Sequence, residues 1–179
     1  GPQAFTAGPM YMGAISVFLF VLGLVVLQGT TKWWIAGISL LALLLGWGKH
    51  FMWLSSLFFD YVPLYNKFRV PSMILTILQL TIPLLGFYSL HQIFSDKIEK
   101  KRVIKGLKLA LGITGGFCLL FALLPSLAGS FTSPADSQFP DWLQQALPED
   151  RQSMLRSDAF RSLLFILAGA ATIWAGYMK

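Results

Sequence analysis

Two basic residues stand where an apolar run is about to begin. Lys67 and Arg69 lie in the stretch "NKFRVPS", and Pro71 follows in the first turn of the next predicted helix. A proline costs little there, because the first amides of a helix have no intrahelical partner. These amides and the positive end of the helix dipole favour an anion, and an arginine beside them can hold a phosphate. Anchoring of both side chains in the lipid headgroups is the alternative.

The same connecting segment, residues 48–69, also contains His50 and Asp60. Its apolar side chains recur every three to four residues, which predicts an amphipathic helix lying in the membrane interface and ending before Pro63. His50 and Asp60 are candidate binding residues there, and a polar interfacial role is the alternative for His50.

A second charged group, Arg151, Asp158 and Arg161, lies near the last apolar run. Asp158 and Arg161 are three residues apart, so they can pair on one helix face. Arg161 stands at the very edge of the apolar run, where a charge is costly unless it faces a cavity or a partner. The three residues are expected to line an outward cavity, or else to form ordinary ion pairs on a solvated helix. Pro140 and Asp141 predict the start of a short helix on the membrane surface, and Pro148, Glu149 and Asp150 predict the start of a second helix that runs on into the last apolar run.

These residues must be positioned by membrane helices. Hydrophobic residues make up 55% of the 179-residue chain and charged residues only 12%, about half the charged fraction of a soluble domain. The fold class predicted is therefore all-α, a polytopic membrane protein forming a single helical unit. The expected membrane helices lie near 11–27, 33–47, 70–93, 107–127 and 159–178. Pro83 within the third is expected to face protein, since neighbours must cover the break that it makes.

The connecting segments set the orientation. The short segment 94–106 is strongly basic and is expected on the cytoplasmic side, whereas 129–158 is net acidic and is expected outside. Alternation then places 48–69 outside, and Lys32 and Lys179 inside. The formal charge of +6 follows from this topology, so nucleic-acid binding is not expected.

The spacing of residues gives no catalytic motif: no metal-ligand cluster, no phosphate-binding loop and no nucleophile with a neighbouring base. Cys118 lies in an apolar run and is predicted to be a small buried apolar residue. Gly115 and Gly116 indicate close helix packing. Polar residues suited to a transport path are few, chiefly Thr76, Gln79 and Thr81.

Three stretches carry a family resemblance: "GPQAFTAGPMYMGA", "FDYVPLYNKFRVPSMIL" and "FTSPADSQFPDWLQQALPEDRQSMLRSDAFRS". Together they resemble the YfhO family of bacterial membrane proteins, in the version common among Bacteroidetes, and the resemblance covers nearly the whole chain. Members are much longer, so the chain is expected to be an internal or C-terminal segment; Gly1-Pro2 is either native or a protease scar.

The resemblance implies a C-type fold glycosyltransferase of the bacterial inner membrane, which takes sugar from a polyprenyl-phosphate carrier for the cell envelope. It implies that Arg69 lies near the carrier phosphate, and that the catalytic acidic residue lies outside this chain. No cofactor is expected in this segment. The expected partners are membrane lipid, the carrier and the remaining helices of the longer protein. A flippase or transporter module for a lipid-linked glycan, or a non-catalytic scaffold, remains the alternative.

Overall fold

The computed structural model describes residues 11–46, 52–62, 74–129, 131–132, 136 and 140–177. Over these residues the protein is all-α, as predicted, with six α-helices and no strand. They are α1 (Ala14–Val26), α2 (Thr31–Gly46), α3 (Met52–Tyr61), α4 (Thr76–Phe94), α5 (Lys100–Leu123) and α6 (Asp141–Tyr177), with a short 3-10 helix, η4 (Pro125–Ala128), after α5.

Three of these helices, α4, α5 and α6, are long and apolar enough to cross a membrane. The apolar helices α1 and α2 are shorter, with 13 and 16 residues. Large apolar side chains cover the outside of the bundle; Leu80, Phe87 and Phe117 are each 65–68% exposed. Such a surface is unfavourable in water and suits lipid, so the fold is that of a multi-pass membrane protein.

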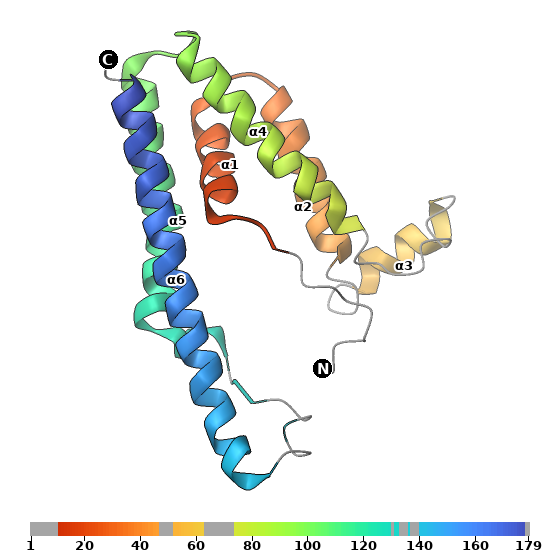
Figure 1. Ribbon diagram of the computed structural model, residues 1–179. Coiled ribbons are helices and arrows are strands. Elements are labelled where there is room, and N and C mark those ends of the chain that lie inside the picture. Colours follow the sequence, from red (N-terminus) through yellow and green to blue (C-terminus); the bar gives the residue numbers. More distant parts are fainter. Residues whose placement is uncertain are drawn as a thin grey trace.

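Helix α1 lies at the centre of the bundle and contacts α4, α5 and α6 (Figure 1). Its buried residues Phe18, Leu22 and Val26 form the middle of the core. Two glycines, Gly86 of α4 and Gly23 of α1, bring these helices close together. A Cβ built on Gly86 would lie 2.8 Å from the Cβ of Leu19. Small residues permit this approach, which is how membrane helices gain packing contacts. Gly115 also faces a neighbour, Leu163 of α6, whereas Gly116 is exposed.

The two ends of the bundle differ in charge. One end carries the α1–α2 connection, the turn 95–99 and the C-terminal end of α6, and we name it the basic end (Figure 1). The other, the opposite end, carries α3, the start of α1 and the start of α6. The described segments expected on the cytoplasmic side therefore share the basic end, and α3 and the start of α6 lie away from it.

The basic segment 94–106 is not a loop throughout, because α5 begins at Lys100 and takes up its second half. The chain reverses within residues 95–99, where Asp96 adopts a positive φ of 52°. The Asp96 amide donates to Ile93 O (3.3 Å) and the Lys97 amide to Gln92 O (3.3 Å), which ends α4. The lysines after this turn therefore lie on a helix surface, where the long side chains reach the headgroups without breaking the helix.

In the segment 129–158 one helix replaces the two that the sequence indicated. Helix α6 begins at Asp141, after Pro140 accepts hydrogen bonds from the amides of Leu143 and Gln144, and it continues for 37 residues through Pro148. The predicted helix start at Pro140 and Asp141 is confirmed, the second predicted start at Pro148 was wrong, and the unbroken continuation into the last apolar run is confirmed. At about 1.5 Å per residue α6 is about 55 Å long, more than a hydrocarbon core requires.

Basic side chains cap the end of α1. Arg102 of α5 donates from Nε to Val26 O (2.9 Å) and from Nη2 to Leu27 O (3.4 Å), and Lys32 donates to Leu24 O (2.9 Å). The last carbonyls of a helix have no intrahelical partner and form the negative end of its dipole. Arg102 and Lys32, which the sequence presented as topology signals, therefore also stabilise the central helix.

Candidate functional site

Several residues predicted to bind the carrier fall outside the described part of the chain. Arg69, Lys67 and His50 are among them, and α3 is the helix predicted within the segment 48–69. Asp60 lies in the last turn of α3 and is exposed. Helix α3 ends at Tyr61, two residues before Pro63, as the sequence indicated. Trp53 and Tyr61 of α3 are 71% and 81% exposed, which suits a helix resting in the headgroups.

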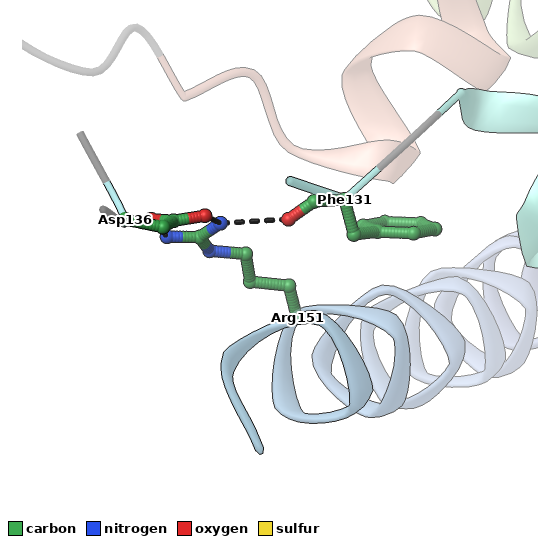
Figure 2. A network of polar contacts seen from close by, with 3 residues as sticks. All are labelled: Phe131, Asp136 and Arg151. Atoms are coloured by element: carbon green, nitrogen blue, oxygen red, sulfur yellow. Dashed lines mark hydrogen bonds and ion pairs between the residues drawn. The ribbon is translucent and has the colours of Figure 1, made fainter. Parts of the chain in front are cut away.

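Arg151 is fixed by an ion pair at the opposite end (Figure 2). Its guanidinium donates from Nη1 and Nη2 to the two carboxylate oxygens of Asp136, at 2.7 Å each, and from Nη1 also to Phe131 O (2.7 Å). Such a bidentate pair fixes both the distance between the two side chains and their relative orientation. It ties the segment before α6 onto the first part of that helix.

Arg151 lies outside the apolar part of α6, which begins at Ala159. The hydrogen bond with Asp136 raises the pKa of Arg151, so the guanidinium keeps its charge over the whole working range of pH. Asp136 had been assigned only to a net acidic segment, and a partner 15 residues away cannot be read from helical spacing.

Asp158 and Arg161 form the predicted pair, but loosely. Arg161 Nη1 lies 3.8 Å from Asp158 Oδ1, and the two side chains are 68% and 72% exposed. Exposed pairs three residues apart contribute little to stability. The guanidinium of Arg161 therefore keeps exposed donors at the edge of the apolar run.

A cavity of about 330 Å³ lies between α1, α5 and α6, and we name it the three-helix cavity. Helix α5 contributes Ile113, Thr114, Phe117 and Cys118 to its lining, and α6 contributes Ser162 and Ile166. The chain before α1 contributes Tyr11 and Met12, at the opposite end of the bundle. On α6 the cavity is thus lined by Ser162, the residue after Arg161, and not by Arg161 itself.

The three-helix cavity suits hydrocarbon better than a polar substrate. Most of its lining side chains are apolar, and the Thr114 hydroxyl donates to Ala110 O (2.8 Å) within its own helix. A volume near 300 Å³ is at the low end of ligand sites, so it has room for part of a chain. Cys118 is half-buried in the lining, in partial agreement with the buried position expected.

The described residues contain no group of three or more His, Cys, Asp or Glu side chains that could hold a metal ion. Of the three polar residues considered for a transport path, Thr81 is buried and its Oγ1 lies 2.8 Å from Ser39 Oγ of α2 in a hydrogen bond between helices. Thr76 and Gln79 are exposed on the outside of α4. Of these three residues, only Thr81 therefore faces the inside of the bundle, where Ser39 engages it.

Fold and cavity together define the class: an all-α protein with three helices able to span a membrane and an apolar cavity between helices. Comparison with protein-family models, with curated proteins and with solved structures finds no match for the chain.

Proposed function

We propose that this chain is part of an integral membrane glycosyltransferase of the YfhO type, which uses a polyprenyl-phosphate-linked sugar donor to modify cell-envelope glycans. In this proposal the chain lines the site of the carrier lipid, in the bacterial inner membrane, with all five apolar helices as crossings. The basic end faces the cytoplasm, and 48–69 and 129–158 face the periplasm. The catalytic residues belong to the rest of a longer protein.

The observation that carries the proposal is the three-helix cavity. It is apolar, lies between membrane helices, and includes residues just before α1 at the end proposed to be periplasmic. A hydrocarbon carrier needs such a place for its chain, and a basic group at the headgroup level for its phosphate. Arg69 is the proposed phosphate ligand, on its place in the sequence before the apolar run 70–93.

The transporter alternative is less well supported. A path for a polar glycan needs polar groups that face a shared interior. Thr81, the buried member of the three considered, is engaged with Ser39. The carrier-binding proposal asks only for an apolar cavity and a basic residue at its mouth.

The first test measures binding of a polyprenyl phosphate to the full-length protein in nanodiscs, wild type against Arg69→Ala. Losing a charged hydrogen bond to phosphate is expected to weaken binding by about tenfold or more. Lys100→Ala is the control, because it removes the same charge at the basic end, where Lys100 Nζ lies 5.9 Å from the Tyr177 ring centroid. Equal losses in both variants would remove the specific site.

A second test addresses the cavity itself. Ser162→Leu adds apolar bulk to the lining and is expected to weaken polyprenyl-phosphate binding several-fold, since the added atoms take up part of about 330 Å³. Ala171→Leu is the matched control: it makes the same kind of change on α6, nine residues on and thus on the opposite face, at an exposed position. Unchanged binding in Ser162→Leu would place the carrier chain elsewhere.

A further inference from the structure

Lys105 and Lys108 of α5 are exposed lysines at the start of a membrane helix. Lys108 is inside the apolar run, one residue after its first member Leu107, and about 12 Å along the helix from Lys100. Among the described residues, no carboxylate lies within ion-pair distance of either ammonium group. A charge at this depth is costly in hydrocarbon unless it reaches the headgroups or meets an anion.

The two lysines stand at one end of a shallow groove on the outside of α5. The groove has a volume of about 410 Å³ and is lined by Lys105, Lys108, Leu109, Gly112 and Ile113. These residues recur at spacings of three and four, so they form one stripe along the helix. Nothing lies within 4 Å of a Cβ built on Gly112, so the middle of the stripe is open.

Helix geometry directs the lysines toward the membrane surface. Side chains in a helix tilt toward its N-terminus, and α5 has its N-terminus at the basic end. Both ammonium groups thus extend toward the headgroup layer, while Leu109, Gly112 and Ile113 continue at greater depth. The stripe is basic where a phosphate would lie and apolar where an acyl chain would lie.

We propose that this groove binds an anionic phospholipid of the leaflet at the basic end. Lys105 and Lys108 hold the headgroup phosphate, and an acyl chain lies over Gly112 between Leu109 and Ile113. Charge complementarity favours a lipid over a second copy of the chain, since two copies joined through this stripe would bring their lysines together. The proposal is independent of the transferase function.

The test measures lipid selectivity of the protein by native mass spectrometry from mixed micelles of phosphatidylglycerol and phosphatidylethanolamine. The wild type is expected to retain phosphatidylglycerol preferentially. Lys108→Gln is expected to lower that preference by about fivefold, because the headgroup phosphate loses the hydrogen bond that the Lys108 ammonium donates. Lys100→Gln removes the same charge from the face toward Tyr177 and is expected to leave the preference unchanged.

Two further variants separate the groove from net charge and from misfolding. Lys108→Arg keeps the charge and is expected to keep the preference. Gly112→Leu puts a side chain into the open middle of the groove, where nothing lies within 4 Å of its Cβ, and is expected to lower retention with both lysines present. Equal losses in Lys108→Gln and Lys100→Gln, or no headgroup preference in the wild type, would overturn the proposal. So would a dimer of the wild type that Gly112→Leu dissociates.

Discussion

Gly86 of α4 lies close to the backbone of α1, and Gly86→Ala should weaken the packing of these two helices measurably. The added Cβ would lie 2.8 Å from Leu19 Cβ, 3.5 Å from Leu19 C and 3.7 Å from Phe20 N. All three atoms belong to the backbone of α1 or are attached directly to it, so no side-chain rotation relieves the contact. The approach is mutual, because a Cβ on Gly23 of α1 would lie 3.1 Å from Leu85 O.

The expected cost follows from the distances. Carbon atoms in favourable contact are about 3.5–4.0 Å apart, so α1 and α4 must separate by about 1 Å to accept the new methyl group. Overpacking of this kind costs about 1–3 kcal/mol. Alanine also gains about 1 kcal/mol over glycine in a helix interior, which partly hides the clash. A matched glycine is therefore needed.

Gly116→Ala on α5 is that control, because nothing lies within 4 Å of its Cβ. Both substitutions share the intrinsic helix gain, so the difference between them isolates the clash. We expect Gly86→Ala to be less stable than Gly116→Ala by about 1–3 kcal/mol, a difference of about 4–8 °C in melting temperature for the middle of that range. The assay is thermal unfolding in detergent followed by tryptophan fluorescence. Equal melting temperatures would refute the close α1–α4 contact.

Three further changes test polar contacts. Arg102→Gln should destabilise the protein by about 1–3 kcal/mol, because it removes charged hydrogen bonds to the last carbonyls of α1. The same melting assay checks this, with Lys101→Gln as the control. Equal effects of the two substitutions would count against the cap. Thr81→Val should cost only about 0.6 kcal/mol, the average for hydrogen bonds between membrane helices; a loss above 2 kcal/mol in SDS unfolding would contradict that value. Arg151→Gln should speed proteolysis before α6, because Asp136 loses its bidentate partner. The charge-swapped double variant, Asp136→Arg with Arg151→Asp, should recover part of the resistance to proteolysis. Unchanged cleavage in Arg151→Gln would show that the pair does not hold the segment.

The helices themselves were largely predictable, because runs of apolar residues with few charges have no other stable arrangement in lipid. The boundaries were less so. Composition placed the start of the fourth helix at Leu107, yet α5 begins at Lys100, since lysine is a good helix former and its side chain can reach the headgroups from inside a helix. Pro148 was taken as a helix start for its type, but α6 contains it in its eighth position.

The candidate site was less predictable, because its parts come from helices far apart in the chain. The three-helix cavity joins Tyr11, Phe117 and Ser162, and no pattern within one helix relates them. Asp136, the partner of Arg151, was not predictable either, because it lies 15 residues away and before α6, where helical spacing gives no relation. The sequence could supply the list of charged residues near apolar runs. The structure then divides this list into residues that pair within the fold and residues that do not.

That division is the most useful guide to function. Arg102 donates hydrogen bonds to carbonyls at the end of α1, and Arg151 donates to Asp136, so both guanidinium groups have partners within the fold. Lys108 has no described carboxylate partner, and Arg161 has only an exposed one at 3.8 Å. Since a basic group at the membrane boundary is costly without an anion, the residues left over by internal pairing are the ones that point to external ligands. An anionic lipid at the basic end satisfies this requirement for Lys108, and a carrier phosphate is the corresponding proposal for Arg69, on its place in the sequence before an apolar run.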